Sequence, residues 1–143
     1  MRPIRELMNQ RPVVGLPLDS TAFAAAETMT KADVGCVLVL GDKGEAEGIF
    51  TERDLMTRVI VRGRDPRKVP LREVMTANVF AVQGDRPIPE VRREMHNRHI
   101  RHIPVLEGDR VVAVLSLRDL LRADLAEQNH MVRYMTAYIR GAT

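Results

Sequence analysis

A hydroxyl residue followed three positions later by an aspartate occurs twice in this chain of 143 residues, as Thr51-x-x-Asp54 and Ser116-x-x-Asp119. At the start of a helix this spacing makes a capping box, because the hydroxyl accepts a hydrogen bond from a free backbone N–H and the acid faces the positive end of the helix dipole. The same geometry suits a nucleotide. Free N–H groups bind an anion, the hydroxyl contacts a phosphate, and the carboxylate accepts hydrogen bonds from ribose hydroxyls.

Arg53 and Arg118 occupy the same position in the two motifs, and a guanidinium there could pair with phosphate. A single motif favours the helix cap, whereas its duplication also indicates a paired ligand site. The sequence contains no Walker loop, no HExxH and no GxSxG, and nothing pairs the two aspartates as an acid and a base. We therefore predict a binding protein and not an enzyme.

The two motifs belong to a longer internal repeat. Three segments recur in the same order, at offsets of 67, 66 and 65 residues. They are Ile4–Met8 with Leu71–Met75, Cys36–Leu40 with His102–Leu106, and Gly48–Met56 with Ala113–Leu121. A copy of this length is too small to bury a comfortable core alone, so we expect the two copies to share a surface.

Each copy predicts the element order β-α-β-β-α. The first helix spans Phe23–Met29 after the candidate caps Asp19, Ser20 and Thr21 in copy one, and continues through Val91–Met95 with Pro87 in its first turn in copy two. The second helices begin near Thr51 and Ser116. The expected strands are Val13–Leu16, Val37–Leu40 and Gly48–Phe50 in copy one, and Val79–Val82, Ile103–Leu106 and Val111–Leu115 in copy two.

The predicted fold class is α+β, with two pseudo-symmetric repeats packed face to face and an extended C-terminal helix. We place repeat one at residues 3–62, a polar linker at 63–70, repeat two at 71–125 and a helical extension at 126–143. The final helix, Leu117 to Ile139, outruns its counterpart in copy one. Its apolar residues recur at mostly helical spacing, without a sustained heptad, and predict a surface for a second chain or a partner: Leu121, Leu125, Met131, Met135 and Ile139. The methionines at helical positions are expected to fill the core.

Three segments resemble the cystathionine β-synthase (CBS) domain: Gly48-Ile-Phe-Thr-Glu-Arg-Asp54, Arg101-His-Ile-Pro-Val105 and Val74-Met-Thr76. Two copies in tandem resemble a CBS pair, or Bateman module, over roughly residues 3–125. The resemblance implies a disc-like module with two clefts between the copies. Such clefts bind AMP, ADP, ATP or S-adenosylmethionine as a regulatory ligand, and no other cofactor is required.

The resemblance also implies a set of ligand contacts. Asp54 and Asp119 would bind ribose, with Thr51 and Ser116 near phosphate beside Arg53 and Arg118. The base would lie against Val14 and Cys36 in copy one, and against Val79, Ala81, His102 and Pro104 in copy two.

These residues predict a regulatory module that senses energy status through an adenine nucleotide and alters a partner protein or the geometry of its own homodimer. The alternative is a ligand-free interaction scaffold or a nucleic-acid-binding protein on the same fold. The net charge of +3 and the pI of about 9.5 permit an anionic partner, but the 3% aromatic content with no tryptophan offers no platform for stacking bases.

The remaining composition excludes several other classes. Cys36 is the single cysteine, so an internal disulfide framework and a multi-cysteine metal site are excluded, and we predict no metal site. No apolar run reaches the roughly 20 residues of a membrane span, and the first residues lack the apolar core of a secretion signal. We therefore expect a cytoplasmic protein with no membrane partner, and the lack of a stacking platform disfavours a nucleic-acid partner.

Overall fold

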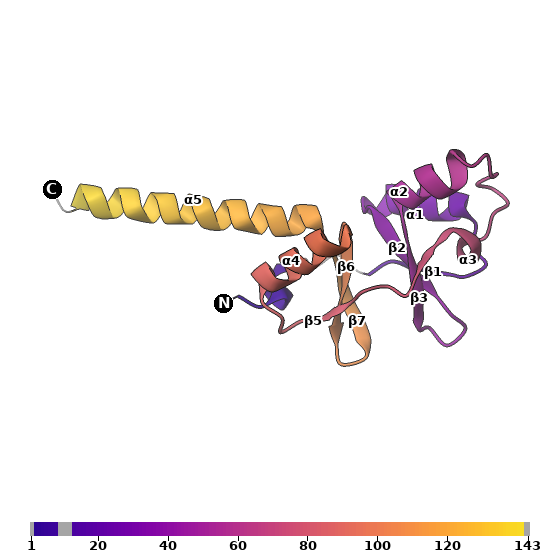
Figure 1. Cartoon of the computed structure of the whole chain (residues 1–143), viewed down its shortest axis with the longest axis horizontal. Coiled ribbons are helices and arrows are strands. Elements are labelled where there is room, and N and C mark those ends of the chain that lie inside the picture. The colour runs from indigo at the N-terminus through magenta and orange to yellow at the C-terminus, as the bar shows by residue number, and fades with distance from the viewer. Residues whose placement is uncertain (1, 9–12, 142–143) are drawn as a thin grey trace.

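The two copies of the repeat form two small α/β units that lie beside each other (Figure 1). The structure is a computed structural model that describes residues 2–8 and 13–141. One unit holds a four-stranded sheet and the other a three-stranded sheet, and the C-terminal helix runs away from the second unit. This confirms the predicted α+β class with two related units and an extended final helix.

The first unit is built on the sheet β1-β2-β3-β4. Strand β1 (Gly15–Pro17) runs parallel to β2 (Cys36–Leu40), which pairs antiparallel with β3 (Ala46–Thr51), and β4 (Thr76–Ala77) closes the far edge. The predicted strands are present, although β1 begins two residues later than expected. Gly48 allows β4 to approach, because a Cβ there would lie 2.7 Å from both Met75 Sδ and Thr76 O.

Helix α1 (Ala22–Ala32) begins at Thr21, whose hydroxyl accepts a hydrogen bond from the Ala24 N–H at 3.1 Å. Of the three candidate caps, Thr21 is the one that holds this position. The second helical segment of the unit continues from α2 (Glu52–Asp54) into a π-helical turn, η2 (Leu55–Ile60). Met56 on η2 is 58% exposed and Met135 on the C-terminal helix is 55% exposed, so the expectation that the helical methionines fill the core is wrong at these two positions.

The second unit repeats the plan with β5 (Val82–Gln83), β6 (His102–Glu107) and β7 (Arg110–Ser116). Of the extended segment predicted over Val79–Val82, only Val82 belongs to a strand. Helix α4 (Ile88–Arg98) begins one residue after Pro87, which holds the extended N-cap position and not the predicted place in the first turn. Helix α5 (Leu117–Gly141) follows β7 directly.

The short helices that open each copy pack on the core of the other copy. Helix η1 (Ile4–Leu7) buries Ile4 in the second core, against residues that include Val82 and Leu120. Its backbone is tied there as well, because the Ile4 N–H donates to Arg86 O at 2.7 Å. Conversely, α3 (Leu71–Val74) buries its first and last residues in the core of the first copy. Each core is therefore completed by a segment from the other copy.

The stretch between the copies packs on the first unit. Val69 is 4% exposed and belongs to the first core, and Arg67 stacks over the Phe23 ring at 4.1 Å. No helix among residues 2–8 and 13–141 is long and apolar enough to span a membrane.

Candidate functional site

Both hydroxyl–aspartate motifs form capping boxes at helix starts. The Thr51 N–H donates to Asp54 Oδ2 at 3.1 Å, and the Asp54 N–H donates to Thr51 Oγ1 at 3.0 Å. The second motif repeats the pair of bonds, with Ser116 N–H to Asp119 Oδ2 at 2.8 Å and Asp119 N–H to Ser116 Oγ at 3.2 Å. The structural interpretation of the motif therefore holds in both copies, and the surroundings decide whether either aspartate can also bind a ligand.

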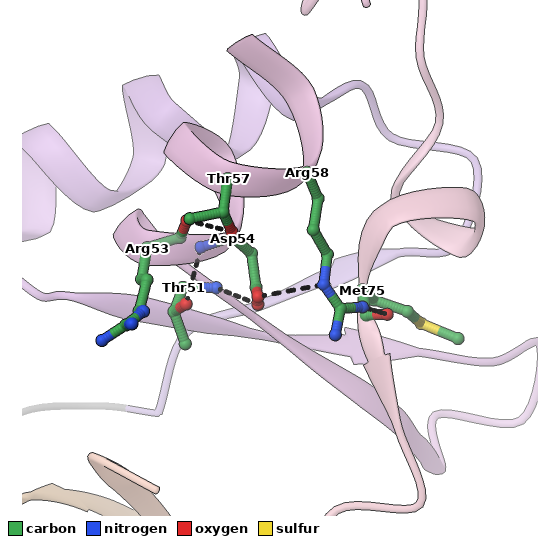
Figure 2. A network of polar contacts seen from close by, with 6 residues as sticks. All are labelled: Thr51, Arg53, Asp54, Thr57, Arg58 and Met75. Atoms are coloured by element: carbon green, nitrogen blue, oxygen red, sulfur yellow. Dashed lines mark hydrogen bonds and ion pairs between the residues drawn. The ribbon is translucent and has the colours of Figure 1, made fainter. Parts of the chain in front are cut away.

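In the first capping box the aspartate is paired with a cation. Asp54 is 8% exposed, and its Oδ1 lies 3.5 Å from Arg58 Nε, one helical turn later. The same guanidinium donates through Nη1 to Met75 O at 2.8 Å, so Arg58 joins the box to the segment that leads into β4. Figure 2 shows this network and shows Arg53 pointing away from the Asp54 carboxylate. The Asp54 carboxylate is thus buried and engaged on both oxygens from within the protein, Oδ2 by the Thr51 N–H and Oδ1 by the Arg58 guanidinium.

The second box lacks this cation. The position one turn after Asp119 is Ala123, which aligns with Arg58 in the repeat. Across the described part of the chain, no ion pair engages Asp119, and its side chain instead lines a cleft. A carboxylate without a cation at the edge of a cavity is available to accept hydrogen bonds from a ligand.

The cleft has a volume of about 390 Å³ and takes its walls from both units. The first unit contributes Val13, Val14, Asp33, Val34, Gly35, Cys36, Leu38 and Glu52, and the second contributes Arg101, His102, Val114, Ser116, Leu117, Arg118, Asp119 and Arg122. Val14 and Cys36, expected beside the motif of their own copy, thus share a cleft with Ser116, Arg118 and Asp119. The volume lies within the roughly 300–1,000 Å³ typical of small-molecule sites.

Backbone pairing within each unit positions the start of the helix that follows its hairpin. In each hairpin the first residue of the inner strand pairs with the hydroxyl residue of the motif, as Cys36 with Thr51 and His102 with Ser116. The first helical N–H of each motif then donates to the residue just before the strand: Glu52 N–H to Gly35 O at 3.0 Å, and Leu117 N–H to Arg101 O at 2.8 Å. These bonds hold both helix starts at the cleft.

Charge in the cleft is divided between three arginines and three acids. Arg101, Arg118 and Arg122 come from the second unit together with Asp119, whereas Asp33 and Glu52 come from the first. Three guanidinium groups on one side offer paired N–H donors of the kind that bind phosphate. The apolar wall opposite, with Val14 and Leu38, suits a flat organic group.

Gly35 allows two polar side chains to meet inside the cleft. A Cβ added there would lie 2.9 Å from Glu52 Oε1 and 3.0 Å from His102 Nε2, so both groups approach the bare backbone. Burial lowers the pKa of His102 below its ordinary value, and it outweighs the carboxylates of Glu52 and Asp119, which raise that pKa. His102 is therefore held toward its neutral form, in which one ring nitrogen donates and the other accepts.

Cys36 is buried in the same wall. Burial, followed by the nearby Glu52 carboxylate, raises the pKa of its thiol to about 12. The thiol thus stays protonated at neutral pH and contributes as an apolar surface and not as a nucleophile.

The other predicted contacts lie elsewhere. Val79, Ala81 and Pro104 line a second, wider hollow of about 990 Å³ that also includes both hairpin turns. Thr51, Arg53 and Asp54 line neither of these two cavities. The structure therefore brings together Val14, Cys36, His102, Ser116, Arg118 and Asp119, and separates the remaining predicted contacts from them.

Sequence reasoning missed Glu52, Arg101 and Arg122 as cleft residues. Glu52 lies inside the first motif, where the hydroxyl, the arginine and the aspartate were predicted as contacts and the glutamate was not. Arg122 lies three residues after Asp119, a spacing that puts both on the same face of α5 and could have been noticed. Among the described residues, no three His, Cys, Asp or Glu side chains gather in a way that could hold a metal ion.

The fold and the cleft define a class of protein: a duplicated α+β module with a binding cavity between its copies. The sequence pattern of the CBS domain matches residues 4–61 and again residues 71–126, which together make up most of the chain. The chain belongs to the CBS-domain family and carries a tandem pair of the domain, as the three motifs predicted.

Related proteins place the chain more closely. The protein "CBS domain-containing protein CBSX3, mitochondrial" of Arabidopsis thaliana is 30% identical over 127 residues, which cover 86% of this chain and 62% of that protein, so this chain spans less than two thirds of its relative. Hypoxic response protein 1 of Mycobacterium tuberculosis is 27% identical over 122 residues, 85% of each chain.

Two solved structures carry ligands. A CBS-domain protein from Pyrobaculum aerophilum complexed with AMP is similar with a TM-score of 0.78 and 28% identity, over 87% of this chain and 96% of that one. Hypoxic Response Protein I with two coordinated zinc ions is similar with a TM-score of 0.69 and 27% identity, over 84% of this chain and 97% of that one.

Proposed function

We propose that the chain is a regulatory module that binds one adenine nucleotide in the cleft between its two copies. The ligand class is AMP, ADP, ATP or S-adenosylmethionine, and binding alters a partner protein or the geometry of the module's own dimer in response to energy status. The AMP complex of the Pyrobaculum relative supports the ligand class. The module has no chemistry of its own to perform, because the proposed function needs only a ligand that binds two conformations unequally.

The observation that carries the proposal is the Asp119 carboxylate, which faces the cleft without a cationic partner among the described residues. In the proposed complex Asp119 accepts hydrogen bonds from the two ribose hydroxyls. Ser116 and the start of α5, which is the positive end of the helix dipole, lie beside the phosphate. Arg118, Arg122 and Arg101 neutralise the phosphate charge.

The base would occupy the apolar wall formed by Val14, Cys36 and Leu38. Asp54, with its carboxylate already paired to Arg58, takes no part in this complex. The proposal therefore assigns one ligand to each chain, although the sequence contains two motifs.

Thermal unfolding with a panel of AMP, ADP, ATP, S-adenosylmethionine and GMP tests the proposal. A ligand at 100 times its dissociation constant adds about 2.7 kcal/mol of stability, which for a chain of this size raises Tm by roughly 5–12 °C. We expect an adenosine ligand to produce this shift in the native chain and in Asp54→Ala, and to lose it in Asp119→Ala.

Two results would contradict the proposal. A shift that survives Asp119→Ala would place the ligand elsewhere. The absence of a shift with every ligand would favour the ligand-free scaffold, and binding to DNA or RNA that weakens steeply with salt would favour the nucleic-acid alternative.

A further inference from the structure

Helix α5 carries a row of large apolar side chains that nothing in the described structure covers. Leu121, Leu125, Val132, Met135 and Ile139 are between 48% and 64% exposed. Figure 1 shows that most of α5 projects beyond the two units, so neither sheet reaches this part of the helix. A row of this length on a folded protein marks an interaction surface.

The spacing of the row identifies what covers it. Of the apolar set predicted from the sequence, the side chain of Met131 lies outside the part of the chain that the structure describes. Val132, which that set did not include, is exposed, and with Gln128 the positions of the row become 121, 125, 128, 132, 135 and 139. The steps run four, three, four, three and four residues, which is the alternation of the a and d positions of a heptad. Such a row makes one narrow stripe that fits a second helix, whereas a helix that packs on a sheet shows a broader apolar face.

Charges lie beside the row and not within it. None of the six positions is charged, and the exposed Arg133 and Arg140 each follow a row residue directly, which turns them toward the outer side of the helix. The row is thus apolar with one exception, the exposed amide of Gln128.

Gln128 indicates which helix is the partner. An amide both donates and accepts, so it is complementary to another copy of itself. In a parallel, in-register pair Gln128 meets Gln128 of a second copy, and the two amides hydrogen-bond across the axis. In an antiparallel pair that overlaps the whole row, Gln128 would instead face Val132 of the second copy, and against an apolar helix of another protein it would also be buried without a partner. A single polar residue in a coiled-coil seam can fix register and orientation.

We propose that α5 pairs with α5 of a second copy of this chain as a parallel two-stranded coiled coil. Leu121, Leu125, Val132, Met135 and Ile139 form the seam, and Gln128 sets the register. The seam spans about 27 Å at a rise of about 1.5 Å per residue. This inference concerns the dimer surface and does not depend on the nucleotide proposal.

Cysteine cross-linking of the full chain tests both the surface and the orientation. Val132→Cys places a thiol on the seam, where the same residue of the second copy is within disulfide range only in a parallel, in-register pair. The native Cys36 is buried with a raised pKa, so it contributes little background. We expect Val132→Cys to form a covalent dimer under mild oxidation and the matched control Ala137→Cys, on the outer side of the same helix, to remain at the background of the unmodified chain.

Equal cross-linking of the two variants would overturn the proposal, because it would report random collision. Cross-linking that requires Gln128→Cys and Val132→Cys together would also overturn it, because it would show an antiparallel pair.

Sedimentation equilibrium provides an independent measurement of the association. We expect the unmodified chain to be a dimer whose dissociation constant rises at least 100-fold in the double variant Val132→Lys and Met135→Lys. Ala137→Lys should leave the constant unchanged, and far-UV circular dichroism should show that all variants keep their helix content. A monomeric unmodified chain, or a double variant that dimerises normally, would overturn the proposal.

Discussion

Thr51–Asp54 and Ser116–Asp119 make the same two backbone hydrogen bonds, yet Asp54 is buried beside Arg58 and Asp119 lines a cleft. The motif itself accounts for the helix start in both copies. What differs is the residue one turn later, Arg58 in one copy and Ala123 in the other. A repeated motif can therefore serve stability at one position and remain available to a ligand at the other.

Ala123→Arg should give Asp119 the kind of cationic partner that Asp54 already has. The new guanidinium would pair with Asp119 as Arg58 pairs with Asp54, and a ligand would have to displace it. Hydrogen bonds to a charged group contribute about 1.5–3 kcal/mol each, so we expect the affinity for the stabilising nucleotide to fall roughly 30-fold. Isothermal titration calorimetry would measure this change.

Ala126→Arg is the matched control for that variant, because it adds the same charge at an exposed position on the same helix. If both variants weaken binding equally, the effect comes from net charge and not from closure of the box.

Removing each carboxylate should separate their contributions to stability. Asp54→Ala loses the bond from the Thr51 N–H to the carboxylate and leaves Arg58 without its carboxylate partner, so we expect the free energy of unfolding to fall by about 1–2 kcal/mol. Asp119→Ala loses the corresponding bond from the Ser116 N–H alone and should cost about 0.5–1 kcal/mol. Urea denaturation without ligand measures both values. An equal or larger loss in Asp119→Ala would show that the second box is as much a structural element as the first.

The smallest predicted effect is the dependence of stability on pH through His102 in the open cleft. The unfolded chain binds the His102 proton near pH 6.5, whereas burial lowers the pKa of this residue in the folded chain. The contribution is therefore complete above about pH 6.5 and is lost as the pH falls from there through the folded pKa. One proton limits the slope to about 1.4 kcal/mol per pH unit.

Urea denaturation between pH 7.5 and pH 5 should show a shallower slope for His102→Gln than for the native chain. His96→Gln, at an exposed position on α4, should keep the native slope. A slope that His102→Gln leaves unchanged would mean that other groups account for the loss at low pH.

The features that depend on residues close together in the chain could be predicted from the sequence. The starts of α2 and α5 follow from the two motifs, and the inner strands follow from short β-branched runs between turns. The family could also be predicted from the sequence, because its motifs keep their order in both copies. The difference between Arg58 and Ala123 at the same position of the aligned repeat was also present in the sequence. Its consequence for Asp54 and Asp119 follows only from the structure, in which Arg58 reaches Asp54.

Contacts between the copies could not be predicted in the same way. Val14 and Cys36 line one cleft, but nothing local says that Asp119, rather than Asp54 of their own copy, shares it with them. Glu52 faces that cleft because Gly35 brings it next to His102 from the other copy. Such placements depend on how two units dock, which is decided by surfaces distant in the chain.

The exchange of η1 and α3 between the two cores sets the order in which this protein can fold during synthesis. Ile4 leaves the ribosome early, but Leu120 of the same core follows 116 residues later, or about 6–23 seconds at typical elongation rates. The first core likewise stays open until Leu71 and Val74 emerge. A nascent chain of one copy's length therefore exposes Ile4 as well as the unfilled face of its own core. The first core can close once Val74 has emerged, whereas Ile4 stays exposed until nearly the whole pair has been translated.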